Sequence, residues 1–190
     1  MKLKNAVVSS LVLALSTFAA YSQTKVVRTG LTSVELASGF VSALGSLHVT
    51  PSPLGSSELT GATIDFPVLA GVFDTSDAHA EIIHGGGLRL TAGGTVVDLR
   101  DFIIDTTGAQ PIITGVVAVD AKVVGRITLF NLTITASDVQ TNSEAKNLLT
   151  IQNVDVTLAS GAAATLNSVF HISALKGGLA IGTADVFAVI

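Results

Sequence analysis

The sequence contains no cysteine and no tryptophan, and its single tyrosine is Tyr21. Without cysteine the chain can form neither a disulfide framework nor a thiolate metal site, and thiol enzymes and cysteine-anchored lipoproteins are excluded as well. Tryptophan and tyrosine supply many sugar-binding and protein-binding surfaces, because they combine a large flat area with a polar tip. Their scarcity makes carbohydrate recognition less expected.

Charge is also sparse. Charged residues make up 13% of the chain, with 10 basic and 14 acidic side chains and no cluster of lysine or arginine. This distribution predicts no nucleic-acid partner and no attraction to an anionic membrane surface. The abundant valine, isoleucine, leucine and alanine residues argue against disorder and favour strands that are buried on at least one face.

The first 22 residues resemble a signal peptide. Lys2 and Lys4 precede an apolar run, and Ala20 and Ser22 are the small residues expected before a cleavage site ahead of Gln23. The apolar run is too short for a transmembrane helix, and no later segment is long enough to be one. We therefore predict a signal peptide over residues 1–22, a single β-rich domain over residues 23–190, and a location in the periplasm, at the cell surface or outside the cell.

The pattern predicts one helix early in this domain. Thr32 and Glu35 have the spacing of a capping box, and Leu36, Phe40 and Leu44 follow at helical spacing. We expect a helix over residues 33–44, followed by a loop around the two prolines at 51–53. A second short helix is expected over residues 162–170, capped by Ser160.

Most of the remaining chain alternates as strands do. About ten strands separated by short glycine-rich or polar turns are expected. Val97 and Leu99 are out of phase with Phe102 and Ile104, which predicts a β-bulge near residues 100–101. Consecutive strands with short connections favour antiparallel pairing, and we predict an antiparallel β-sandwich or flattened barrel with two short helices.

Candidate ligand-binding residues occur at one glycine-rich turn. His84 precedes Gly85, Gly86 and Gly87, and three successive glycines allow close approach of a backbone or a ligand. His79 lies five residues before His84, so the two side chains of a strand would point to opposite faces. We therefore predict no shared metal site, and name His84 and the three glycines as a candidate ligand-binding turn.

Catalytic patterns are missing from the sequence. Asp98, Asp101 and Asp105 follow one another along a predicted strand, which is compatible with a carboxylate-dependent hydrolase but is also the pattern of a charged outer face. The segment Asp74 to Asp77 lacks the spacing of a calcium loop. No serine lies in a Gly-x-Ser-x-Gly turn. We therefore predict no catalytic residue and no metal site.

Three short motifs resemble the HtaA family of exported bacterial haem-binding domains. The helix segment Ser38-Gly39-Phe40-Val41-Ser42-Ala43 is similar to the family's Ser-Phe-x-x-Tyr helix, Phe66-Pro67 to its Phe-Pro strand end, and His84-Gly85-Gly86-Gly87-Leu88 to its His-x-Gly-x-Leu turn. The resemblance covers roughly residues 32–105. It implies an exported β-rich fold and places the family's haem-coordinating tyrosine near Ala43, where this chain has none. His84 alone carries over as a ligand-type residue.

These observations favour an exported, non-enzymatic binding or structural domain whose partner is unknown, with residues 74–87 and 137–147 as candidate contact loops. The alternative is a carrier of a small apolar ligand, either haem or a lipid, held between the strands. A hydrolase that uses the three aspartates is the second alternative. No cofactor is predicted under the first hypothesis, and haem is the candidate cofactor under the second.

Overall fold

The computed structural model describes residues 24–135, 137–141 and 147–190. The predicted signal peptide and part of the predicted contact loop 137–147 lie outside the described residues. No helix in the described part of the chain is long and apolar enough to cross a membrane. The elements are, in chain order, β1 (Thr24–Val27), β2 (Thr29–Leu36), α1 (Ser38–Ser46), β3 (Thr50–Leu54), β4 (Glu58–Thr60), β5 (Thr63–Asp74), β6 (Ala80–His84), β7 (Gly87–Ala92), β8 (Thr95–Asp105), β9 (Ile112–Val119), β10 (Lys122–Thr133), β11 (Val139–Thr141), β12 (Leu148–Leu158), α2 (Ser160–Phe170) and β13 (Ala180–Val189).

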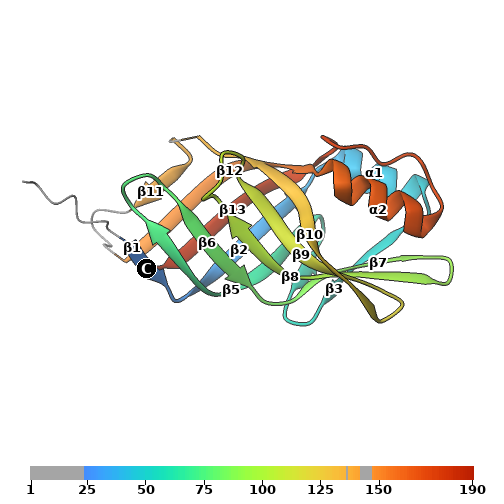
Figure 1. Cartoon of the computed structure of the whole chain (residues 1–190), viewed down its shortest axis with the longest axis horizontal. Coiled ribbons are helices and arrows are strands. Elements are labelled where there is room, and N and C mark those ends of the chain that lie inside the picture. Colours follow the sequence, from blue (N-terminus) through green and yellow to red (C-terminus); the bar gives the residue numbers. More distant parts are fainter. Residues whose placement is uncertain (1–23, 136, 142–146) are drawn as a thin grey trace, which may run out of the picture.

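Eight antiparallel strands close into a barrel (Figure 1). The order around it is β5, β2, β13, β12, β10, β9, β8 and β6, and β6 pairs with β5 again. Closure depends on β5, which pairs with β1 and β2 along one edge and with β4 and β6 along the other. The predicted β class and antiparallel pairing are confirmed. The sandwich and the count of ten are wrong, because the described residues form 13 strands in one sheet that closes on itself.

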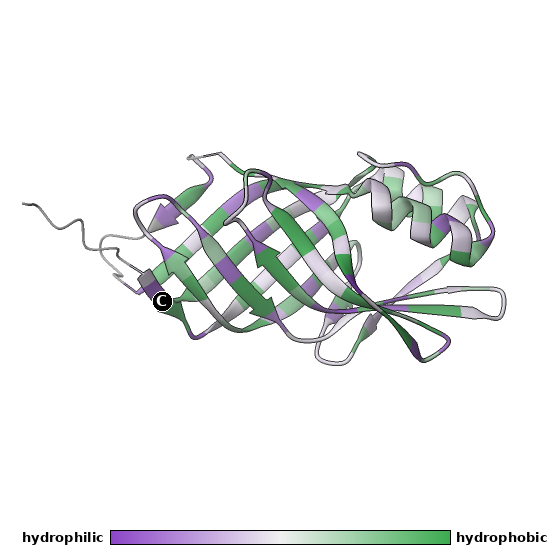
Figure 2. Ribbon diagram, in the orientation of Figure 1, coloured by the Kyte–Doolittle hydropathy of each residue, from purple (hydrophilic) through white to green (hydrophobic). Residues whose placement is uncertain are grey.

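Strand alternation fills the barrel with apolar side chains. Along β12, Ile151, Val154 and Val156 are buried while their neighbours are at least partly exposed, and Figure 2 shows the same alternation of hydrophobic and hydrophilic residues around the barrel. Burial of such residues is worth about 1.5–3 kcal/mol for each large side chain. The barrel interior is therefore the hydrophobic core of the molecule.

A β-bulge divides β8 into two parts. The pairing with β9 shifts between Arg100 and Ile103, and Asp101 adopts a positive φ of 54°. The bulge brings Phe102 onto the same buried face as Leu99, which confirms the prediction. Residues 95–100 pair with β7, whereas residues 103–105 pair with β6. The first part of β8, together with β7 and β3, extends away from the barrel (Figure 1), and we name these three segments the flap.

Both helices lie at the same end of the barrel, beside the flap (Figure 1). The predicted helix over residues 33–44 is partly wrong: Thr32 and Glu35 belong to β2, and α1 starts at Ser38 without a side-chain cap. In β2, Thr32, Val34 and Leu36 are buried at the spacing of a strand. The second helix is confirmed over Ser160–Phe170, but Ser160 is its first residue and does not cap it. The expected loop at residues 51–53 is the strand β3 at the edge of the flap, a position where prolines are tolerated.

Candidate functional site

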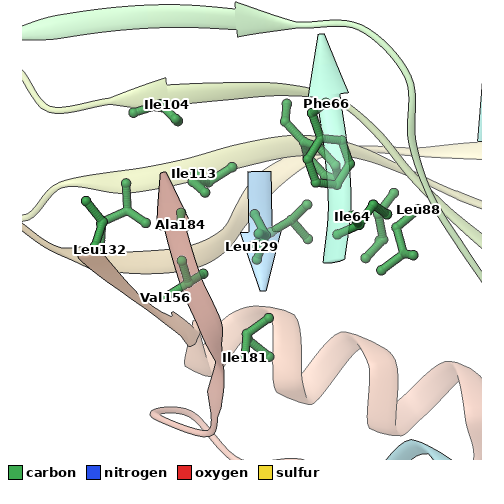
Figure 3. Packing of buried hydrophobic residues seen from close by; sticks show 14 of the residues in the cluster. Ile64, Phe66, Leu88, Ile104, Ile113, Leu129, Leu132, Val156, Ile181 and Ala184 are labelled. Atoms are coloured by element: carbon green, nitrogen blue, oxygen red, sulfur yellow. The ribbon is translucent and has the colours of Figure 1, made fainter. Parts of the chain in front are cut away.

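A cavity of about 70 Å³ lies where the barrel meets the helices and the flap. Two of its 23 lining residues, Thr32 and His84, are polar, and no described residue that lines it is charged. Figure 3 shows part of the buried apolar cluster, which includes Ile64, Phe66 and Leu88 of the cavity lining. Apolar lining residues come from α1 (Phe40, Leu44, Leu47), α2 (Leu166, Phe170), the flap (Leu88, Leu90, Leu99), and the barrel and its connections (Val34, Leu36, Val49, Ile64, Phe66, Phe102, Ile104, Ile113, Phe130, Val156, Leu158, Leu175, Ile181).

His84 is the polar centre of this cavity. It is the last residue of β6, opposite Val68 of β5, and its side chain is 3% exposed. Its Nε2 lies 2.7 Å from the hydroxyl oxygen of Thr32 on β2. Its Nδ1 lies 3.4 Å from the carbonyl oxygen of Phe102. A carbonyl oxygen only accepts, so Nδ1 carries the proton and Nε2 accepts from the Thr32 hydroxyl. The lone pair of Nε2 is thus engaged by the hydroxyl of Thr32, and both residues belong to the cavity lining.

The carbonyl that binds His84 lies next to the bulge in β8. The register of β8 with β9 shifts between Arg100 and Ile103, and its register with β6 ends where Ile103 faces Ile83. His84 is the next residue of β6, and its Nδ1 contacts the carbonyl oxygen of Phe102 at 3.4 Å. This contact sets the tautomer of His84, because the hydrogen bond made by one ring nitrogen determines which nitrogen carries the proton.

Burial also determines the charge of His84. Desolvation is the largest cause and lowers the pKa of His84 from 6.5 to about 4, although hydrogen bonds to the backbone of Phe102 and Ile82 oppose it. Removal from water disfavours the imidazolium, because no anion lies close enough to compensate. His84 is consequently neutral at physiological pH, and its Nε2 carries a lone pair that accepts from the Thr32 hydroxyl rather than a second N–H.

The three glycines after His84 hold the turn to β7. Gly85 donates its backbone N–H to Pro67 O (2.9 Å), and Gly87 donates its N–H to the hydroxyl of Ser57 (2.8 Å). Gly86 has a φ of +76°, and a side chain there would collide with Ser57. None of the glycines lines the cavity. The three glycines therefore lie in the turn after His84, where the lack of a side chain lets the turn pack closely against neighbouring backbone atoms. Their predicted contact with a ligand stays a prediction.

The other histidines lie apart from the cavity lining. His79 is exposed and pairs with Asp77 through Nδ1 at 3.0 Å. His48 and His171 follow α1 and α2, each in a left-handed backbone conformation. Among the described residues, no group of three histidine, cysteine, aspartate or glutamate side chains could hold a metal ion.

The three candidate aspartates each have a local partner. Asp98 accepts from Nε and Nη2 of Arg89 at 2.7 and 2.8 Å, and this hydrogen bonding lowers the pKa of Asp98. Asp101 contacts Arg100 at 3.3 Å. Asp105 accepts from the hydroxyl and backbone of Thr107, which lowers the pKa of Asp105. None of the three lines the cavity, so they do not share a cleft with each other there.

Sequence reasoning missed Thr32 and the apolar walls. The capping-box spacing predicts a helix cap at Thr32, whereas Thr32 is buried on β2 and contacts His84 from 52 residues away. Leu88 and Leu90 of the flap are further lining residues. The signal that could have identified Thr32 is the alternation of residues 32, 34 and 36. Ala43, where the family resemblance places a tyrosine, is half-buried on α1 and does not line the cavity.

Comparison with known proteins gives similarity in structure alone. No protein-family model and no curated protein matches the sequence. Among solved structures, the C-terminal domain of HtaA from Corynebacterium glutamicum superimposes with a TM-score of 0.66 at 13% identity, over 86% of this chain and 98% of that domain. The N-terminal domain of HtaA gives 0.60 at 9% identity, over 87% and 99%. The haem-binding protein HtaB of the same organism gives 0.53 at 15% identity, over 87% and 95%. The resemblance to HtaA domains is therefore confirmed at the level of the fold, and this chain has the fold of the HtaA and HtaB domains.

Proposed function

We propose that this chain is a non-enzymatic binding domain that holds a small apolar ligand in the cavity beneath α1 and α2, with haem as the first candidate. One observation carries the proposal: an apolar cavity is lined by a single neutral imidazole, whose Nε2 accepts a hydrogen bond from Thr32, the other polar lining residue. Such cavities, apolar with a few convergent polar groups, are typical of ligand sites. The fold shared with a protein named for haem binding supports haem in particular.

One residue of the lining could hold a haem iron. Nε2 of His84 would be that ligand if the Thr32 hydroxyl turned away, and the Nδ1–H···O bond to Phe102 is the kind of outer contact that orients metal-binding histidines. Five phenylalanines among the lining residues offer flat apolar surface: Phe40, Phe66, Phe102, Phe130 and Phe170. A bound haem would supply the iron that His84 coordinates.

The cavity volume sets a condition on entry. About 70 Å³ is well below the roughly 300–1,000 Å³ of pockets that enclose drug-sized ligands. A macrocycle can therefore enter only if the helices and the flap move apart. Within the flap, β7 pairs with β3 and with β8, and residues 97–100 of β8 pair with β9 of the barrel, so opening at the flap would have to leave or bend this pairing.

The proposal is tested by titrating hemin into the purified protein and following the Soret absorbance. We expect saturable binding with a Soret shift, and its loss or a weakening of at least about tenfold in His84→Ala. His79→Ala is the matched control, because His79 is exposed and remote from the cavity lining. Linear, non-saturable absorbance in the wild type would refute haem binding, and equal binding by His84→Ala would refute the role of His84.

Export belongs to the same proposal. A carrier outside the cytoplasm agrees with the predicted signal peptide and with the lack of cysteine. Fractionation of cells that produce the tagged full-length chain tests it, and recovery of the uncleaved chain in the cytoplasm alone would contradict export.

A further inference from the structure

We propose that α2 and the loop after it, residues 160–177, form a lid that opens the cavity by turning about a single hinge. We name this segment the lid. The inference rests on the proposed function in one respect, because it takes the cavity as the place where a ligand binds. It adds the route by which a ligand enters and assigns to Asn167 the role of holding the lid in its closed form.

The two ends of the lid meet at one place. The N–H of Gly178 donates to Leu158 O, and the N–H of Leu158 donates to Leu179 O, both at 2.8 Å. Between these points the loop runs back along α2 (Figure 1), and a side chain at Gly177 would collide with Ser160 at the start of the helix. The lid therefore leaves the barrel and returns to it at the same point, between β12 and β13.

Hydrogen bonds join the lid to the rest of the described chain only at this hinge. Next to its start, Ala159 donates to Leu129 O of β10 at 2.9 Å, and near its end Leu179 donates to Lys176 O at 3.2 Å. Within the described residues, the remaining hydrogen bonds of residues 160–177 lie inside the lid or reach Ala159. The flap strands, in contrast, all lie in ladders. The lid can therefore move as one body without breaking a strand ladder.

Apolar contacts hold the lid against the barrel. Leu166 and Phe170 of α2 and Leu175 of the loop line the cavity, and Leu175 is the one buried residue among residues 171–179. Such contacts are non-directional and follow the buried area. A lid held by them can open and close without re-forming an ordered ladder. Opening withdraws the three side chains together and exposes the cavity to solvent.

Asn167 fixes Leu175 in the underside of the lid. Its Nδ2 donates to Leu175 O at 2.8 Å, and its Oδ1 accepts from the N–H of Leu175 at 3.1 Å. In the part of the chain that the structure describes, no other hydrogen bond links residues 173–177 to α2. Asn167 itself does not line the cavity. It is therefore a positioning residue, which keeps Leu175 in the cavity wall through one amide group.

The lack of cysteine lets a single introduced thiol report the opening. Val156→Cys places the thiol in the cavity lining, whereas Val154→Cys places it on the same strand outside that lining, and the two valines are 2% and 3% exposed. Each variant of the full chain is incubated with methyl methanethiosulfonate, a small uncharged reagent, and labelling is followed by intact mass. A buried thiol reacts when a local opening exposes it. We expect Val156→Cys to be labelled at least about tenfold faster than Val154→Cys.

Loss of the Asn167 amide should make opening more frequent. Asn167→Ala removes two hydrogen bonds, each worth about twofold to about tenfold in an equilibrium constant, and alanine does not weaken the helix itself. Labelling of Val156→Cys should accelerate at least about fivefold, and labelling of Val154→Cys should change by less than about twofold. Ser168→Ala, at the exposed next position of α2, is the matched control and should change neither rate. If Asn167→Ala does not fold, Asn167→Asp replaces it, because it keeps the acceptor for the N–H of Leu175; at least about twofold acceleration is then expected.

Three results would overturn the lid. Equal labelling of Val156→Cys and Val154→Cys would mean that the cavity opens only together with the barrel. Similar acceleration of both reporters by Asn167→Ala would mean that Asn167 supports the whole fold rather than the lid. No acceleration of either reporter would place the opening elsewhere in the cavity wall. Because these experiments contain no ligand, their failure is distinguishable from a failure of hemin to bind.

Discussion

The buried imidazole of His84 should make the stability of the protein depend on pH between about 6.5 and 4. In this window the unfolded chain binds a proton at His84 and the folded protein does not, because burial lowers the pKa of His84 from 6.5 to about 4. The free energy of unfolding therefore falls as the pH falls. The stability is fully present above pH 6.5 and the loss is complete below pH 4.

The magnitude follows from the two pKa values. Linkage gives a loss of about 2 kcal/mol at pH 5 and about 3 kcal/mol at pH 4, relative to pH 7.5. These values are a large part of the 5–15 kcal/mol that typically stabilises a folded domain. The lowered pKa values of Asp98 and Asp105 act in a different window: their ordinary value is 3.8, so their contribution is lost only as the pH falls below about 4.

The assay is denaturant unfolding followed by far-UV circular dichroism, because the chain lacks tryptophan and fluorescence is a poor probe. Wild type, His84→Gln and the exposed control His79→Gln are compared at pH 7.5, 6, 5 and 4. The difference between wild type and His84→Gln should shrink by about 2 kcal/mol from pH 7.5 to pH 5, and His79→Gln should follow the wild type. Parallel pH dependence of wild type and His84→Gln would refute the reasoning, since it would mean that His84 titrates equally in both states.

Two further predictions concern the turn and the wall of the site. Gly86→Ala should destabilise the protein by about 1–3 kcal/mol, and by more than Gly93→Ala, because both glycines have a positive φ but only Gly86 lies against Ser57. Thermal unfolding measures both variants, and equal losses of stability would contradict the close packing at Gly86. Phe102→Ala should cost about 3–5 kcal/mol in denaturant unfolding, because the ring is buried and packs edge-on against Phe66 with 5.1 Å between centroids. Phe187→Ala, which removes a ring that is 40% exposed, is its control and should cost less than about 1 kcal/mol, and similar costs for both would argue against a packed wall at Phe102.

Local patterns predicted the elements, and long-range pairing determined how they close. The phase change between Leu99 and Phe102 is a local signal, and it correctly indicated the bulge. Barrel closure depends on β5 and β6 meeting β2 and β8, and no short window of sequence distinguishes this from a sandwich. The segment around Thr32 and Leu36 satisfies the spacing of both a helix and a strand. Pairing decides for the strand, because residues 29–36 lie in register with β13 on one side and residues 30–35 with β5 on the other.

For the candidate site as well, local features could be predicted from the sequence and long-range contacts could not. His84 could be named from the sequence, since three glycines follow it and mark a place of close approach. Its partner Thr32 could not, because the two residues are 52 positions apart and meet only when β2 and β6 flank β5. The residues that line the cavity could not be predicted either, because they come from two helices, the flap and the barrel, which lie far apart in the sequence.

The bulge in β8 connects the fold to the chemistry of the site. It separates residues 95–100, which pair with β7, from residues 103–105, which pair with β6, and it places Phe102 between the two parts. The carbonyl of Phe102 accepts the Nδ1–H of His84, so Nε2 accepts from the Thr32 hydroxyl in the cavity lining. One irregularity thus builds a wall of the cavity and sets the tautomer of its only titratable group.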